Sequence, residues 1–230
     1  VTVFTAFRQT GNCKTGKLGT VKPANCKQAK GPFSMIISLV NTKGGTAKTT
    51  SAIYLALAFH NRGRQVVVLD LDKQGSATDW ADRATEAGDP LPFPVHVVNM
   101  KRLVKYATDG DDQVVIIDTP PGDGQVIDAA IGASNFVIMP TAATGLDTAR
   151  VWETLPSVQG RLPYGILITS ARLGTNLLED AKAAFDSNDA ARFDTIIPMR
   201  ERIRSTFGTT PKHDEGYSDV VDEITEALTA

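Results

Sequence analysis

The sequence is poor in long apolar runs, cysteine and histidine, and each shortage argues against a class of protein. No apolar run approaches the roughly 20 residues that a membrane-spanning helix needs. Both cysteines, Cys13 and Cys26, precede residue 35, so the rest of the chain offers no thiol, which fits a cytosolic protein. The three histidines are scattered, so they suggest no metal cluster. The composition, 42% hydrophobic and 22% charged, is otherwise that of a globular domain.

Acidic residues are missing from the first 34 positions, which carry a charge of +6 from Arg8, Lys14, Lys17, Lys22, Lys27 and Lys30. The whole chain carries −2, so the remainder carries −8. Because the first predicted strand begins at Met35, we favour Met35 as the biological start and residues 1–34 as upstream translated sequence or a cloning remnant. A genuine nucleic-acid-binding arm and a small added hairpin are the open alternatives.

From Met35 onward, segments typical of strands and helices alternate, which predicts a three-layer α/β domain over residues 35–230. Its sheet is expected to be mostly parallel, with helices on both faces. The predicted strands are 35–40, 65–70, 95–98, 113–118, 136–139, 165–169 and 193–197. The predicted helices begin with 51–59 and continue with 76–85, 100–107, 125–133, 148–158, 177–185, 200–207 and 219–228.

A glycine turn joins the first predicted strand to the first predicted helix. The turn reads NTKGGTAKTT over residues 41–50, and backbone N–H groups in such a turn can point at a phosphate. Lys48 would then contact the β- and γ-phosphates, and the Thr49 hydroxyl would ligate Mg²⁺. The predicted nucleotide-binding residues are Lys43, Gly44, Gly45, Thr46, Ala47, Lys48, Thr49 and Thr50. The alternative is a glycine-rich turn with two solvated lysines.

Acidic residues follow two of the buried strands. Asp70 and Asp72 follow the second strand, and Asp118 ends the strand 113–118. Ligands of doubly wound sheets bind outside the carboxyl ends of the strands. We therefore predict that Asp118 holds Mg²⁺, directly or through a water, although it could simply cap a turn. Asp123 is predicted to cap the next helix.

The string Lys-Gly-Gly-x-x-Lys-Thr-Thr resembles the deviant Walker A loop of the ParA/MinD family of dimerising P-loop ATPases. The extra lysine of that family falls on Lys43. Ala47 departs from the usual glycine, and a Cβ is tolerable there only if φ is negative, so we expect a working but slightly altered loop.

Later segments extend the resemblance over residues 35–228. LDLDKQGS at 69–76 resembles the family's D-x-D-P-Q-G segment, with Lys73 where proline is usual, which implies that Asp72 positions the attacking water. Asp70 is then expected to be structural. TPPG at 119–122 resembles the switch II turn. IPMR at 197–200 resembles the base-pocket segment and implies that Pro198 and Met199 contact the nucleotide.

The resemblance is strongest to short ParA proteins and implies a Mg²⁺-dependent ATPase for DNA partition, cytoplasmic and nucleoid-associated. ATP would join two subunits, and the catalytic residues would be Lys43, Lys48 and Asp72. The homodimer would bind DNA non-specifically, and a ParB-type partner would stimulate hydrolysis. Arg200, Arg202 and Arg204 are the densest basic cluster of the domain and are predicted to bind DNA phosphates. The alternative for these arginines is a solvated helix face paired with acids.

Other members of the same family define the competing hypotheses. MinD-like regulators end in a basic amphipathic helix that lies on lipid, whereas residues 219–230 here are acidic with no basic residue, so no membrane partner is expected. Iron–sulfur relatives need cysteines that this domain lacks. No feature of the sequence selects an ATP-dependent synthase.

Overall fold

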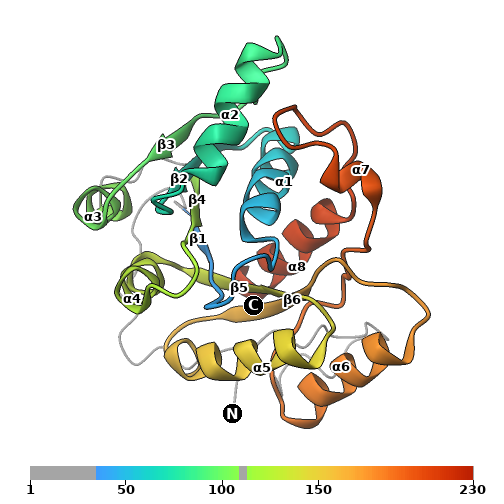
Figure 1. The fold of residues 1–230 in the computed structure, drawn as a ribbon. Coiled ribbons are helices and arrows are strands. Elements are labelled where there is room, and N and C mark those ends of the chain that lie inside the picture. The colour runs from blue at the N-terminus through green and yellow to red at the C-terminus, as the bar shows by residue number, and fades with distance from the viewer. Residues whose placement is uncertain (1–34, 109–112, 230) are drawn as a thin grey trace.

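The computed structural model describes residues 35–108 and 113–229, so the interpretations of residues 1–34 lie outside it. In the described ranges the chain forms one six-stranded sheet in which all neighbouring strands are parallel (Figure 1). The strand order is β3-β2-β4-β1-β5-β6. The bounds are β1 Met35–Leu39, β2 Gln65–Asp70, β3 Val95–Val97, β4 Gln113–Asp118, β5 Phe136–Thr141 and β6 Tyr164–Ile168.

Helices cover both faces of this sheet, as the alternating pattern predicted. The face under β1 residues Met35, Ile37 and Leu39 packs against α1, α2 and α8, and the opposite face packs against α3, α4, α5 and α6. The helix bounds are α1 Lys48–Asn61, α2 Ser76–Glu86, α3 Met100–Thr108, α4 Gly124–Ala133, α5 Gly145–Thr154, α6 Asn176–Ser187, α7 Glu201–Arg204 and α8 Tyr217–Thr229.

The strands are buried because they run through the middle of this three-layer arrangement. Val, Ile and Leu dominate β1, β2 and β4, and the core strands of a parallel sheet covered on both faces are apolar on both sides. Helix α1 is also buried along most of its length, from Ser51 to Phe59, between the sheet and α8. Among the described residues, no helix combines the length and apolarity needed to cross a bilayer.

The register of the central strands brings the predicted functional residues to one edge. Strand β4 lies between β2 and β1, and Asp118 is paired with Leu39 on one side and with Asp70 on the other. Parallel strands share the direction of their carboxyl ends. The loops that follow β1, β2 and β4 therefore leave the sheet side by side.

Two strand predictions were wrong in detail. Residues 193–197 form no strand; isolated bridges at Arg192 and Pro198 flank them, and the Glu223 carboxylate accepts the N–H groups of Asp194 and Thr195. Strand β5 does not stop before Pro140 but continues to Thr141. Its pairing with β1 ends at Ile138, so the missing N–H of Pro140 interrupts no ladder on that side.

Several helices differ from their predicted bounds, and a cap explains one of the differences. Helix α5 begins at Gly145 rather than Thr148, because Thr144 accepts the N–H of Asp147 as an N-cap. Beyond α5 a 3₁₀ turn, Leu155–Ser157, contains the predicted interruption at Pro156. Helix α7 covers only Glu201–Arg204 of the predicted 200–207.

Candidate nucleotide site

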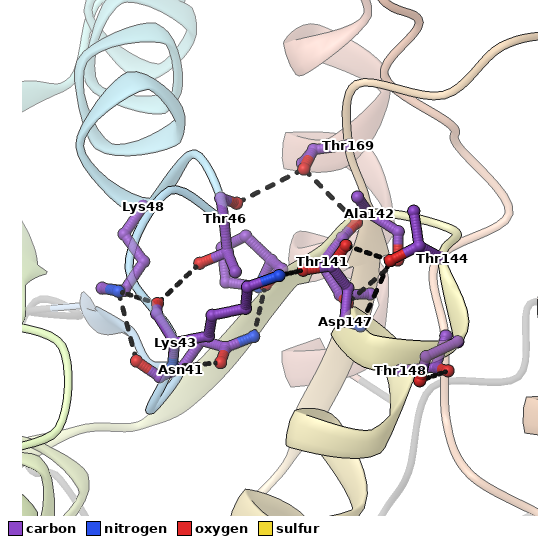
Figure 2. Close-up of polar contacts among 12 residues, drawn as sticks. Asn41, Lys43, Thr46, Lys48, Thr141, Ala142, Thr144, Asp147, Thr148 and Thr169 are labelled. Atoms are coloured by element: carbon purple, nitrogen blue, oxygen red, sulfur yellow. Dashed lines mark hydrogen bonds and ion pairs between the residues drawn. The ribbon is translucent and has the colours of Figure 1, made fainter.

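The turn between β1 and α1 is held in shape by its own side chains. Lys48 Nζ donates to the carbonyls of Asn41 and Lys43 at 3.1 and 2.9 Å (Figure 2). Asn41 accepts the N–H of Lys43 at 2.9 Å and donates from Nδ2 to the Pro140 carbonyl at 2.9 Å. The predicted phosphate-binding loop is therefore anchored to the end of β5, with its lysine folded back across it.

The expectation of a negative φ at Ala47 was wrong. It lies immediately before α1 with φ +67° and ψ +27°, in the left-handed region. A Cβ costs free energy in this conformation, which glycine adopts freely. The loop keeps the backbone shape that the usual glycine would give, and it is strained at this position.

Thr49 and Asp118 meet at the start of α1. The Thr49 hydroxyl donates a 2.7 Å hydrogen bond to Asp118 Oδ2, while the buried Oδ1 atom has no hydrogen-bond partner among the described residues. Burial raises the pKa of Asp118 to about 7, although the Thr49 hydrogen bond and the charge of Lys48 oppose the rise. A buried carboxylate with an unpartnered oxygen beside a hydroxyl fits a Mg²⁺ that is also held by phosphates.

No group of three or more His, Cys, Asp or Glu side chains in the described part of the chain could hold a metal alone. Mg²⁺ is usually bound by one or two protein ligands together with substrate phosphates. Lys48 adds positive charge near Asp118. Burial lowers the pKa of Lys48, and the negative charges of Asp118 and Asp72 partly offset that effect.

The two acids after β2 have different surroundings. Asp70 is fully buried and accepts hydrogen bonds from the backbone of Asp72 and from the backbone and hydroxyl of Thr78. Its contacts are those of a structural residue, as expected. Asp72 is half-buried, and one of its oxygens accepts the N–H of Gln74 at 2.9 Å. Asp72 is thus accessible at the edge of the site, where a water could reach it.

Lys43 leaves the loop in a different direction from Lys48. Its ammonium lies 2.5 Å from Asp147 Oδ1, in the first turn of α5, where Figure 2 shows the two side chains pointing toward each other. The Thr144 hydroxyl donates to the other oxygen of Asp147. Nothing near Asp147 in the sequence marked it, since an acid in the first turn of a helix is common.

The rest of the loop is supported by neighbouring turns. The Thr169 hydroxyl, at the end of β6, lies 3.3 Å from the carbonyls of both Thr46 and Thr141. Gly44 faces Pro121 of the 119–122 turn, since an added Cβ would lie 3.8 Å from the proline ring. The turn that resembles switch II therefore packs directly on the phosphate-binding loop. Asp123 caps α4 by accepting the N–H of Val126, as predicted.

The predicted base-pocket and DNA-binding residues lie on one segment after β6. Met199 is partly exposed, and its N–H bonds to the Ala171 carbonyl. Arg200 and Arg202 both bond to Glu215, whose side chain is 1% exposed. Glu215 is a non-glycine residue with φ +59°, and no local pattern in the sequence pointed to its role. Arg204 has no ion-pair partner in the described ranges.

The parallel sheet, the loop between β1 and α1, and the acid at the end of the adjacent β4 together define a P-loop nucleotide-binding protein. The family model described as the CobQ/CobB/MinD/ParA nucleotide binding domain matches residues 37–209, and the chain belongs to this family. The predicted ATPase class is thereby confirmed, and ATP with Mg²⁺ is the ligand pair that it implies for the loop.

Curated relatives are named for distribution and partition. The chain is 35% identical over 125 residues to "Maintenance of carboxysome distribution protein A" of Gloeobacter kilaueensis, which covers 54% of this chain and 56% of the relative. It is 29% identical over 214 residues to "Chromosome-partitioning ATPase Soj" of Thermus thermophilus, with coverage of 76% and 86%. The match to the Gloeobacter protein thus spans little more than half of that relative, whereas the Soj match spans most of it.

Solved structures share the fold. The ATP complex of a McdA variant from Cyanothece superposes with a TM-score of 0.67 at 16% identity, covering 85% of this chain and 98% of that one. MinD of Pyrococcus horikoshii, complexed with Mg-ADP, superposes with a TM-score of 0.63 at 18% identity, covering 85% and 99%. These likenesses confirm the three-layer α/β fold.

Proposed function

We propose that the chain is a partition ATPase, which forms an ATP-dependent dimer, binds DNA non-specifically and is stimulated by a ParB-type adaptor. The observation that carries the proposal is the divergence of its two loop lysines. Lys48 lies across the phosphate loop, whereas Lys43 extends out of it toward α5. A lysine whose side chain points away from its own loop would be free to contact the phosphates of a second subunit.

Different residues of one subunit would bind the phosphates of ATP, hold Mg²⁺ and orient the attacking water. Backbone N–H groups of residues 44–50 and Lys48 bind and orient the phosphates. Thr49 and Asp118 would hold Mg²⁺, which neutralises phosphate charge when bound. Asp72 would orient the attacking water, and Pro198 and Met199 would flank the base. Lys43 of the second subunit would add positive charge where negative charge develops during transfer.

DNA binding is supported by local charge rather than net charge. The domain without its first 34 residues carries −8, so any DNA surface must be a restricted basic region. Residues 200–204 provide three arginines within five positions. Of these, Arg204 is the strongest candidate for a phosphate contact, because Arg200 and Arg202 already bond to Glu215. Their side chains nevertheless remain 41% and 51% exposed.

Sedimentation of the full chain tests this proposal. With Mg²⁺ and a non-hydrolysable ATP analogue we expect a dimer that co-sediments with duplexes of unrelated sequence, and with no nucleotide a monomer that does not. The matched control is Lys48→Ala, which should remain monomeric in both conditions because it lacks the lysine on the phosphates. A chain that stays monomeric with the analogue, or binds DNA equally well without it, would contradict the proposal.

A second candidate is the distribution of a protein cargo instead of a DNA replicon. The specific observation that favours it is the 35% identity to the Gloeobacter protein named for carboxysome distribution. The two candidates differ in the adaptor that stimulates hydrolysis. A DNA-binding adaptor from a neighbouring reading frame that accelerates ATP hydrolysis by this chain would support partition, whereas stimulation by a cargo-bound protein without DNA affinity would support distribution.

A further inference from the structure

We propose that a second DNA-binding surface lies at the carboxyl ends of β2 and β3, where Lys73, Lys101 and Arg102 contact phosphates of the duplex backbone. These three residues are called the edge cations below. The inference rests on the proposed function and adds to it a binding site that is separate from residues 200–204. It is supported by the absence of acidic partners, by the pairing of the two strands and by the side that α3 presents to solvent.

The edge cations are exposed and have no acidic partner in the described ranges. Other exposed basic side chains of the domain bond to a carboxylate, as Arg62 does to Asp222 and Lys212 does to Asp89. An unpaired cation can bind a phosphate without first giving up an internal ion pair. Within residues 35–108 and 113–229, the exposed lysines and arginines that form no ion pair are Lys73, Lys101, Arg102, Arg172 and Arg204.

The sequence of α3 is basic although the domain as a whole is acidic. Residues 90–108 contain Lys101, Arg102 and Lys105 but no aspartate or glutamate, whereas the domain carries −8. The next acids begin at Asp109, eight residues after Lys101. A local basic region of this kind is what a protein of negative net charge needs in order to bind a polyanion.

Strand pairing brings the edge cations to one edge of the sheet. The N–H of Val98, just past the end of β3, bonds to the Asp70 carbonyl at 3.0 Å. Lys73 lies three residues after Asp70, and Lys101 lies three residues after Val98. Arg102 follows in the first turn of α3. Because β2 and β3 are parallel, these residues all come after the carboxyl ends of neighbouring strands.

The first turn of α3 is remote from the phosphate loop of its own subunit. In the strand order, β2 and β4 separate β3 from β1. Neighbouring strands lie about 4.8 Å apart, which puts β3 roughly 14 Å from β1. The other predicted DNA-binding segment begins near the opposite end of the sheet, where Pro198 bridges to Ala171 after β6. In Figure 1, α3 and α7 accordingly lie on opposite sides of the molecule.

Helix α3 presents its charged side to a ligand, because its apolar side is already covered. Leu103 is 1% exposed and belongs to the same core cluster as Val98 and Ile117, and Tyr106 packs against that cluster. A helix that lies on lipid must bury its apolar face in the bilayer. Duplex DNA requires only cations, since its backbone is a dense row of negative charges. The edge cations therefore suit the duplex backbone better than a membrane.

The test measures the affinity of the full chain for a labelled duplex over a range of salt concentrations, with Mg²⁺ and the non-hydrolysable ATP analogue. Lys101→Ala combined with Arg102→Ala removes two edge cations and keeps α3, because alanine favours helices. The plot of log affinity against log salt concentration should become shallower by about 1.8 for each subunit on the duplex, since each lost phosphate contact contributes about 0.9. Affinity at low salt should fall by about ten-fold or more.

Arg161→Ala combined with Lys182→Ala is the matched control. It also removes one arginine and one lysine, but these already lie beside Asp128 and Glu179. The control should leave the salt dependence close to that of the wild type. Equal losses in the two double variants would mean that only net charge matters, which would overturn the second surface.

Dimerisation separates this inference from the proposed function. The Lys101 and Arg102 double variant should dimerise with the analogue as the wild type does, and a lost dimer would assign these cations to the subunit interface instead. If the variant keeps wild-type DNA affinity and salt dependence, the second surface is overturned, and residues 200–204 and the proposed function stand. A wild-type chain that binds no duplex would contradict the proposed function itself, and the inference with it.

Met100→Gln tests whether charge is the cause. Val97 and Met100, beside the edge cations, are 58% and 42% exposed. A protein partner would bury these apolar side chains, whereas phosphate contacts do not need them. Met100→Gln should therefore leave the affinity for the duplex unchanged. A loss as large as that of the Lys101 and Arg102 double variant would show that the shape of this edge, rather than its charge, is recognised, and would overturn the assignment to phosphates.

Discussion

The Thr49 hydroxyl and the Asp118 carboxylate, 69 residues apart in the chain, share a hydrogen bond of 2.7 Å at the mouth of the phosphate-binding loop. This bond joins the first turn of α1 to the carboxyl end of β4. It also places a hydroxyl and an unpartnered carboxylate oxygen together, as a Mg²⁺ beside phosphates requires.

Replacing Asp118 should therefore change nucleotide affinity, whereas replacing Asp72 should change the rate of hydrolysis. Asp118→Ala should weaken nucleotide affinity by about ten-fold or more with Mg²⁺ present and change it little in EDTA, because it removes a metal ligand. Asp72→Ala should keep nucleotide affinity and slow hydrolysis by about a hundred-fold, because it removes the group that orients water. Titration with a fluorescent nucleotide and single-turnover hydrolysis separate the two. Equal losses of affinity in both variants would reject this division.

Lys43→Ala should bind nucleotide nearly as the wild type does and fail to dimerise, because the side chain of Lys43 points away from its own phosphate loop toward α5. Hydrolysis and dimer-dependent DNA binding should fall with dimerisation. Lys43→Arg should restore dimerisation only in part, since a planar guanidinium differs from an ammonium in reach and geometry. Sedimentation with the ATP analogue, alongside a nucleotide titration, provides the measurement. A Lys43→Ala dimer of wild-type strength would reduce Lys43 to a turn residue.

Ala47→Gly should stabilise the nucleotide-free chain, because it relieves a Cβ at φ +67°. The gain should be about 1 kcal/mol, the cost of a left-handed alanine reduced by the greater freedom of glycine in the unfolded chain. Ala87→Gly is the matched control, since Ala87 is the C-cap of α2 with φ −75° and its replacement should lower stability. Urea unfolding of both variants gives the comparison, and two losses of similar size would mean that Ala47 is unstrained.

Arg204→Ala should weaken DNA binding by a similar factor for all duplex sequences, because phosphate contacts carry no sequence information. The dependence of affinity on salt should also become shallower. Arg161→Ala is the control, as a partly exposed arginine on the opposite side of the sheet near Asp128. Fluorescence anisotropy over a range of salt concentrations tests this. Wild-type affinity in the Arg204 variant would place the DNA surface elsewhere.

Glu215 should make the 200–216 segment sensitive to acid. Burial alone would raise the pKa of Glu215, but hydrogen bonds and charge from Arg202 and Arg200 outweigh burial and lower it. The stability that this carboxylate provides is therefore present above its unfolded pKa, about 4.3, and is lost as the pH falls through the lower folded value.

The matching variant is Glu215→Gln. It should unfold more easily than the wild type by about 1 kcal/mol at pH 7, a modest value because both arginines are partly exposed. The difference should shrink as the pH falls below the unfolded value of about 4.3. Denaturant unfolding across this range follows the difference, and a gap that stays constant with pH would assign the stability to packing rather than charge.

The fold and half of the site were readable from local sequence. Apolar runs ending in acids predicted β2 and β4, and the glycine turn predicted the loop at residues 41–50. Some failures were local, as at Ala47 and at the start of α5, and others were non-local. Whether 193–197 pairs as a strand is decided by Glu223, about 30 residues later, which takes two of its N–H groups. Asp147 and Glu215 could not be found because their partners come from elsewhere in the fold.

The position of β4 between β2 and β1 affects when the nucleotide site forms during folding. A chain emerging from the ribosome completes the phosphate-binding loop early, but Asp118 arrives some 70 residues later and must insert between two strands already made. Such long-range parallel pairing is slow, because loop closure precedes the contacts that reward it. Tight Mg²⁺-nucleotide binding thus becomes available only once the middle of the sheet has closed, and it therefore reports on the closure of β4 between β2 and β1.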